Sequence, residues 1–275
     1  IETIGRGGGF CSSTASFIIL SMTTAAEILR TLESMRDQRQ AAHLMRFFKT
    51  GKGDYGEGDL FLGLRCPQTR MVVKEARLDV SFDEIEKLLY SAWHEVRLAG
   101  FLLLVEEMKA VLPRKKDSSA SAKTKAGRRD EIAAFYLRHA SQANNWDLVD
   151  MTCPKILGEW LLYPSADGSM PDRSVLDTLV SDNCLWKQRI GIVTTWRLIK
   201  EGQPDDTLRL AAKLLTHRHD LIHKAVGWML REVGKKDPEV LTDFLERYYS
   251  AMPRTALRYA IEKMDERTRL GWLRR

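Results

Sequence analysis

A repeat of paired helices in the C-terminal half constrains the fold of this chain more than any other feature. The dipeptides Pro171-Asp172, Pro204-Asp205 and Asp237-Pro238 recur at intervals of about 33 residues and each predicts a helix start, because proline suits a first turn. A second helix follows each, and Gly202 and Gly234 predict where successive second helices end. Pairs of this size bury their apolar faces by stacking. The sequence therefore predicts an α-α superhelix of HEAT-like helical repeats, curved into a solenoid with a concave surface.

The rest of the chain also has a helical pattern. Apolar residues recur at three- and four-residue spacing, as at Ile28, Leu29 and Leu32, and no alternating strand pattern competes. Ser81 with Glu84 predicts a capping box at a helix start. The expected fold class is all-α.

Three segments depart from this pattern. Residues 1–21, rich in glycine and serine, predict a flexible N-terminal extension before a single repeat domain over 22–275. Residues 50–59 hold too many glycines for a helix and predict a loop. Residues 114–129 carry seven lysines and arginines against one aspartate, which predicts a solvated basic loop over about 113–129. That loop is either a plain linker or an arm that grips DNA.

Charge and cysteine usage limit the possible partners. The formal net charge of +6 and the pI near 9.1 favour a polyanion, which would make the concave groove basic. The four cysteines form no CxxC pair, which argues against disulfides and zinc and fits the reducing cytoplasm. His219 and His223 have i, i+4 spacing without a metal-binding motif. We expect no metal, no cofactor and no membrane partner.

The segment Asn144–Asp150 carries the first candidate site. Either asparagine can cap a helix, and Trp146 and Asp150 are then i and i+4 on one face. A carboxylate and an indole would share one patch of the surface. The alternative is that Trp146 belongs to the core and Asp150 complements the helix dipole.

The second helices of two later repeats carry further candidates. Gly227 in mid-helix predicts close approach by some other group. Trp228 beside it either lines the groove or packs between helices, and Arg189 is a candidate phosphate contact. The basic residues expected to line the groove and bind DNA are Lys187, Arg189, Lys224 and Arg231.

Several ordered motifs resemble one known family. From about Thr23 to the C-terminus the chain is similar to the AlkD-type DNA alkylation repair enzymes, which are HEAT-like-repeat alkylpurine DNA glycosylases. The resemblance rests on five segments: Tyr55–Arg65, Asn145–Asp150, Leu185–Arg189, Lys224–Gly234 and Met252–Glu262.

The resemblance implies a role for each matching residue. Asp150 corresponds to the catalytic aspartate, and Trp146 and Trp228 correspond to the tryptophans beside the lesion sugar. Arg189 corresponds to the arginine at the active-site backbone. Phe47 falls at an aromatic contact that is tyrosine in some members, so it lacks that hydroxyl. The resemblance also implies recognition of the lesion through the DNA backbone, with the base outside a tight pocket.

The implied reaction is hydrolysis of the N-glycosidic bond of N3-methyladenine or N7-methylguanine in double-stranded DNA, the first step of base excision repair. An alkylated purine is already a cation and leaves as a neutral base, so one carboxylate that stabilises an oxocarbenium-like sugar suffices. The expected protein is a monomeric monofunctional glycosylase of the cytoplasm, near the nucleoid in a bacterium. The alternatives are a non-catalytic helical-repeat DNA binder or scaffold, and a protein-binding solenoid.

Overall fold

The computed structural model of the 275-residue chain describes residues 23–275. The extension predicted for residues 1–21 lies outside the described residues. Over residues 23–275 the chain is helical and no strand is present; Leu60 and Trp93 share one isolated bridge. The predicted all-α class is confirmed.

The helices are, in chain order, α1 (Ala25–Ser34), α2 (Gln38–Phe47), α3 (Cys66–Ala76), α4 (Phe82–Leu89), α5 (His94–Ala110), α6 (Ser119–Arg138), the 3₁₀ turn η1 (Ala140–Gln142), α7 (Trp146–Asp150), α8 (Cys153–Trp160), α9 (Ser174–Val180), α10 (Leu185–Lys200), α11 (Asp205–Leu214), α12 (Asp220–Lys236), α13 (Pro238–Tyr248), the 3₁₀ turn η2 (Tyr249–Ala251), α14 (Arg254–Ala260) and α15 (Glu266–Arg274).

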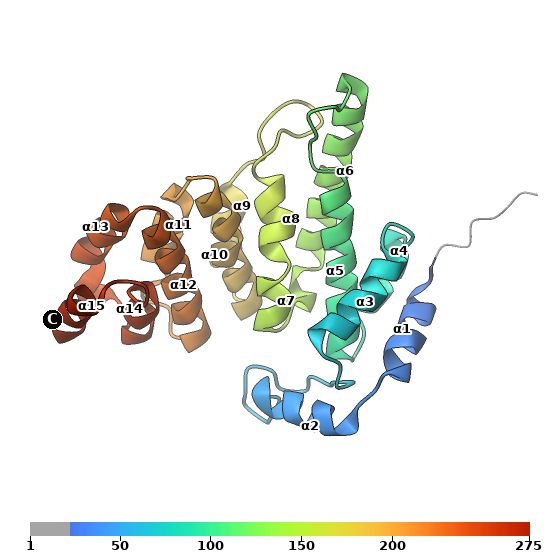
Figure 1. Ribbon diagram of the computed structural model, residues 1–275, viewed down its shortest axis with the longest axis horizontal. Coiled ribbons are helices and arrows are strands. Elements are labelled where there is room, and N and C mark those ends of the chain that lie inside the picture. Colours follow the sequence, from blue (N-terminus) through green and yellow to red (C-terminus); the bar gives the residue numbers. More distant parts are fainter. Residues whose placement is uncertain (1–22) are drawn as a thin grey trace, which may run out of the picture.

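Helix pairs stack along the long axis of the molecule, as Figure 1 shows. Helices α8, α10, α12 and α14 pack one against the next, and α9, α11 and α13 pack on the other side of the helices they accompany. Each pair contacts mainly its neighbours, which is the arrangement of a repeat solenoid. The α-α superhelix predicted from the 33-residue interval is confirmed.

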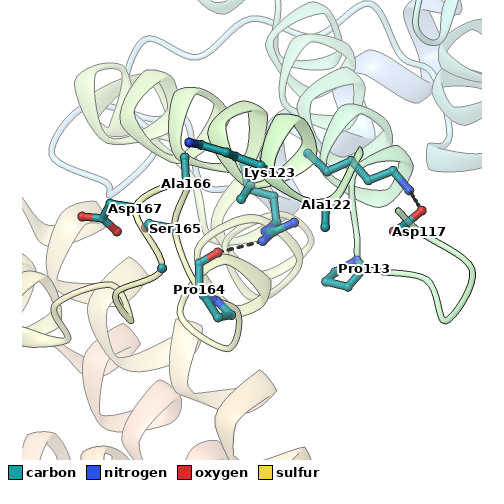
Figure 2. A pocket seen from close by; sticks show the side chains of 12 residues that line it. Pro113, Asp117, Ala122, Lys123, Pro164, Ser165, Ala166 and Asp167 are labelled. Atoms are coloured by element: carbon teal, nitrogen blue, oxygen red, sulfur yellow. Dashed lines mark hydrogen bonds and ion pairs between the residues drawn. The ribbon is translucent and has the colours of Figure 1, made fainter. Parts of the chain in front are cut away.

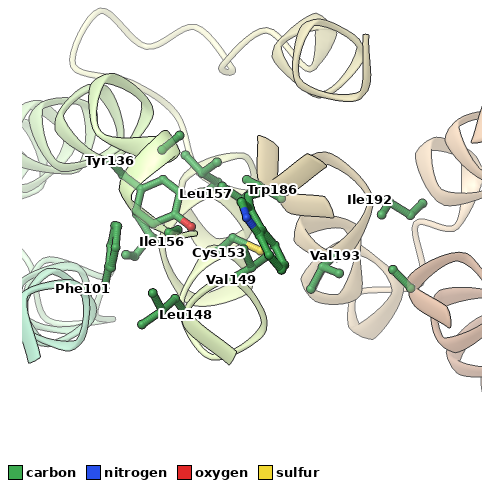
Figure 3. Close-up of a cluster of buried hydrophobic side chains, with 14 of the residues drawn as sticks. Phe101, Tyr136, Leu148, Val149, Cys153, Ile156, Leu157, Trp186, Ile192 and Val193 are labelled. Carbon is green, nitrogen blue, oxygen red and sulfur yellow. The ribbon is translucent and has the colours of Figure 1, made fainter. Parts of the chain in front are cut away.

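The core is continuous where the first and second halves of the chain meet. Tyr136 of α6 and Cys153 of α8 are fully buried there, close to Val149 of α7 and Trp186 of α10 (Figure 3). Helix α5 is buried on nearly every side because α3, α4, α6 and α8 surround it. This packing fixes α7 between α5 and α10.

Glycines and prolines of the repeats test the predicted helix boundaries. Gly202 has a φ of +74° directly after the end of α10, as expected. The helix end predicted at Gly234 is wrong, because α12 continues to Lys236. A Cβ on Gly234 would lie 2.3 Å from a methyl carbon of Leu241, so this glycine makes room for α13.

Two proline predictions are confirmed and one is wrong. Pro204 caps α11 and Pro238 opens α13, whereas Pro171 lies three residues before α9. Asp172 instead accepts the Ser174 N–H at 2.8 Å and shapes the turn into α9.

The glycine in mid-helix behaves as predicted. A Cβ on Gly227 of α12 would lie 2.4 Å from the carbonyl oxygen of Ala256 and 2.5 Å from Cβ of Tyr259. Helices α12 and α14 therefore approach each other more closely here than any side chain allows.

Near the N-terminus, the predicted capping box is half formed. The Ser81 hydroxyl accepts the Glu84 N–H at 3.3 Å, but the Glu84 carboxylate accepts the Ala25 N–H at 2.8 Å. The glutamate thereby ties α4 to α1. The glycine-rich segment 50–59 consists of turns, as predicted.

The basic loop predicted over about 113–129 is wrong for most of its length. Ser118 caps α6, and the helix runs from Ser119 onward through the lysines and arginines. Arg129 donates hydrogen bonds to the carbonyl oxygens of Val111 and Pro164 at 3.0 and 2.8 Å, and Lys125 pairs with Asp117. Figure 2 shows the dashed contacts that end at Pro164 and Asp117. Alanine, lysine and arginine are strong helix formers, and local ion pairs offset the charge of the lysines and arginines.

Candidate active site

The short helix α7 places an indole and a carboxylate one turn apart. Asn145 caps it, with its Oδ1 accepting the Trp146 N–H at 2.9 Å. Trp146 is half-buried, and the Asp150 side chain is 16% exposed. The predicted cap and the i, i+4 pair are both present, so one turn of helix presents both groups to the same side.

Arg189, in the first turns of α10, holds both oxygens of Asp150. Its Nε–H donates to Oδ1 at 2.8 Å and its Nη2 donates to Oδ2 at 2.7 Å. Nη1 donates to the carbonyl oxygen of Leu221 at 2.6 Å, and the Arg189 side chain is 6% exposed. Such a bidentate pair fixes the orientation of the carboxylate.

Burial affects the pKa of Asp150 more than the pairing with Arg189 does. It raises the pKa of Asp150 above the ordinary value, Arg189 opposes this rise, and the nearby charge of Asp147 adds to it. A carboxylate in such surroundings interacts strongly with any positive charge that develops beside it, because little water screens the site.

A cavity of about 310 Å³ opens beside Asp150. Its walls come from α2, from the chain before α3, and from α5 and α7. Phe48 stacks on Trp146 with ring centroids 5.3 Å apart, and Phe47 meets Trp146 edge-on at 6.0 Å. Phe47 is 56% exposed. The structure thus brings Phe47, Trp146 and Asp150 together around one opening.

Helix α2 is held by a small hydrophobic cluster of its own. Ala41, Phe48 and Phe61 form this cluster, and Leu44 and Trp146 pack against it. Trp146 also packs against the main core and joins the two, so the α2 wall of the cavity depends on few apolar contacts.

The predicted groove residues of α10 and α12 carry paired charges. Lys187 lies 3.0 Å from Asp182, Lys224 lies 2.8 Å from Asp220, and Arg231 pairs with Glu262. The side chains of Lys187 and Lys224 are 32% and 39% exposed, whereas that of Arg231 is 18% exposed. Trp228 is half-buried on α12, one turn after Lys224. These pairs reduce the positive potential that the sequence alone indicates.

The two histidines with metal-like spacing lie at the start of α12. His219 Nδ1 accepts the Leu221 N–H at 3.1 Å, and His223 Nε2 lies 2.5 Å from the carbonyl oxygen of His217. Over residues 23–275 no three histidine, cysteine, aspartate or glutamate side chains gather in a geometry that could hold a metal ion.

A buried polar network in the wall of the cavity was missed by the sequence analysis. His94 at the start of α5 lies between two carboxylates, with Nδ1 2.8 Å from Asp59 and Nε2 2.9 Å from Asp147. Arg97 also pairs with Asp59, and Asn145 Nδ2 donates to Asp59 at 3.4 Å. The network joins the glycine-rich loop, α5 and α7. Neither the type nor the spacing of these residues marks them in the sequence, because they come from three distant segments.

A family model of DNA alkylation repair enzymes matches residues 28–264, which is most of the chain. The chain belongs to the DNA alkylation repair enzyme family. Membership in this family indicates a role in alkylation repair, with DNA as the partner. It also bears out the coarser part of the resemblance seen in the sequence.

Solved structures agree with this family at the level of the fold. One of them, a predicted DNA alkylation repair enzyme from Enterococcus faecalis, aligns with a TM-score of 0.57 at 16% sequence identity. The alignment covers 84% of this chain and 97% of that chain. At this identity the likeness concerns the superhelix. A search of the curated proteins gave no match.

No helix in the described part of this alkylation repair family member combines the length and the apolarity needed to cross a membrane.

In this alkylation repair family member, the buried network predicts a pH-dependent stability. Burial by itself lowers the pKa of His94, but the carboxylates of Asp147 and Asp59 more than offset it and raise the pKa to about 9 from 6.5. Protonation of His94 therefore stabilises the fold fully below about pH 6.5, and this contribution is lost as the pH rises through 9. We expect the free energy of unfolding to fall by about 3 kcal/mol over this range.

Urea unfolding of the parent protein and of His94→Gln at pH 6, 7.5 and 9 measures this loss. The variant should be less stable at pH 6 and should lack the decline attributed to His94. An equal decline in both proteins would show that other groups cause it.

Proposed function

We propose that this protein is a monofunctional DNA glycosylase that hydrolyses the N-glycosidic bond of cationic N3- or N7-alkylated purines in duplex DNA. The observation that carries the proposal is the placement of Asp150. Its carboxylate is held from behind by Arg189, shares a helical turn with Trp146, and faces an open aromatic-walled cavity.

The chemistry needs no general acid, because the alkylated purine leaves as a neutral base. Cleavage leaves a cation-like sugar, and its positive charge develops at C1′. A fixed, poorly solvated carboxylate stabilises that charge and orients the attacking water, without reorganising during the reaction. Asp150 fits this role in its ionised form.

Aromatic side chains around Asp150 suit the contact with the sugar. The face of Trp146, one turn from Asp150, would hold the deoxyribose and add attraction for its developing charge; the same contact is assigned to Trp228 of α12 from the resemblance alone. Phe47, exposed and edge-on to Trp146, would extend this surface towards the duplex. Its ring supplies apolar contact in place of the hydroxyl found in some members of the resembling family.

Arg189 and the lysines would have different roles in the site. Arg189 is nearly buried and committed to Asp150, so we assign it to holding the carboxylate rather than to gripping a phosphate from solvent. Lys187 and Lys224 are partly exposed on neighbouring helices and could exchange their aspartate partners for DNA phosphates. Arg231, less exposed, would contribute less to binding.

The deciding experiment incubates the protein with duplex DNA containing N7-methylguanine or N3-methyladenine and follows the free base by chromatography. We expect base release from both DNAs. Binding carried by a few lysine–phosphate contacts should weaken about 10- to 100-fold between 50 and 200 mM salt. Strong salt-sensitive binding without release from either DNA would refute the enzyme and leave the DNA-binding solenoid. Weak binding that salt hardly changes would favour the protein-binding solenoid.

A further inference from the structure

We propose that His94 is a positioning residue for Asp150: its imidazolium, held between Asp59 and Asp147, balances the charge of Asp147 and fixes the first turn of α7. This inference rests on the proposed function for its catalytic meaning, but the geometry that supports it lies in the buried network in the wall of the cavity.

The first support is where the network ends. Asp147 follows Trp146 directly, and Asp150 is the last residue of the same five-residue helix. Because Nε2 of His94 lies 2.9 Å from Oδ2 of Asp147, the hydrogen bond ties the first turn of α7 to α5. A helix of one turn has little internal stability, so contacts of this kind determine where its side chains point.

The second support is charge. Oδ1 of Asp147 is buried and has no hydrogen-bond partner among residues 23–275. Within that part of the chain, His94 is therefore the cation paired with Asp147. An uncompensated buried carboxylate destabilises the fold and repels any neighbouring negative charge. Asp147 already adds to the raised pKa of Asp150.

The third support is that His94 is itself firmly placed. Its ring is 2% exposed and stacks on Phe61 at 4.5 Å, with Phe48 at 5.0 Å. On its far side, Asp59 is bound by Arg97 and Asn145 as well. Phe48 also stacks on Trp146, so one contiguous set of contacts leads from His94 to the site.

Other ionisable groups around Asp150 do not replace His94 in this role. On α7 itself the neighbouring group is Asp147, and those that face Asp150 from the elements packed against it are Arg189, Tyr136 and Cys153. Burial raises the pKa values of Tyr136 and Cys153, which keeps both neutral at working pH. The other ionisable groups that line the cavity are His94, Glu95, Arg65 and Cys66. The carboxylate of Glu95 accepts hydrogen bonds from the N–H groups of residues 62–64.

The test measures the protonation of Asp150 and the rate of base release in the same proteins. Aspartate labelled with carbon-13 at the side-chain carboxyl reports the titration of Asp150 by NMR, with Asp150→Asn identifying the signal. Single-turnover base release is followed over the same pH range. The variants are His94→Gln, Asp147→Asn and the double variant. His139→Gln is the matched control, because His139 is a buried histidine beside Glu86 instead.

In His94→Gln, the titration of Asp150 and the acid limb of base release should both move up by about one pH unit, because Asp147 is no longer balanced. Asp147→Asn should move both down, and the double variant should return near the parent. His139→Gln should leave both in place. An unmoved Asp150 titration in His94→Gln overturns the inference, whether or not base is released. A moved titration in a protein that releases no base upholds the electrostatic link and refutes the proposed function.

Discussion

Replacing Asp150 with asparagine should lower the rate of base release by at least about 100-fold. The substitution removes the negative charge that stabilises the sugar cation but keeps an oxygen that can accept from Arg189. Because the lysines expected to contact phosphates are untouched, the affinity for duplex DNA should change by no more than about threefold. Single-turnover release of N7-methylguanine and a DNA-binding titration measure the two quantities.

A control separates this effect from a general loss of charge. Asp243 is an exposed carboxylate on α13, remote in the superhelix from α7, and Asp243→Asn should leave both quantities unchanged. Thermal unfolding of both variants must also be measured, because in Asp150→Asn the buried Arg189 cation lies beside a neutral partner. Full base release by a folded Asp150→Asn protein would remove Asp150 from the chemistry.

Gly63→Ala should lower the free energy of unfolding by more than about 3 kcal/mol. Gly63 has a φ of +92°, and a Cβ there would lie 2.0 Å from the carbonyl oxygen of Asp37 and 2.7 Å from the Ala41 nitrogen. Both contacts are with backbone at the start of α2, so no side chain can move aside. Chemical denaturation followed by circular dichroism gives the change.

The matched control is Gly53→Ala in the glycine-rich loop. Gly53 has a φ of +81° with open space where the Cβ would stand, so its substitution carries the backbone strain alone, about 1 kcal/mol. Similar losses of unfolding free energy in the two variants would mean that the backbone around Gly63 shifts to admit the Cβ without cost.

Local rules predicted part of this structure well. An asparagine before Trp146 and a four-residue step to Asp150 define the cap and the shared face of α7 within one short segment. The same holds for Gly227, because a glycine inside a helix is costly unless another backbone needs the space. Where the cause of a feature lies within a few residues, the sequence is sufficient to predict it.

Other features depend on partners that are distant in the sequence. The carboxylates that flank His94 come from residues 35 positions before it and 53 positions after it. The aspartates paired with Lys187 and Lys224 lie nearby in sequence, but only the fold shows that these pairs form. In the segment from Arg114 to Arg129 charge suggested a loop, whereas Ser118 and the intrinsic helix preference of the following residues decided the outcome.

The separate cluster that holds α2 has a consequence for the energy landscape of the site. Because α2 is fastened mainly by Ala41, Phe48 and Phe61 and only Trp146 joins this cluster to the main core, we expect α2 to open at a free energy below that of global unfolding. Detachment of α2 is then a local, sub-global event in which the superhelix stays intact. The cavity beside Asp150 would then admit ligands wider than its resting width, because α2 forms one of its walls.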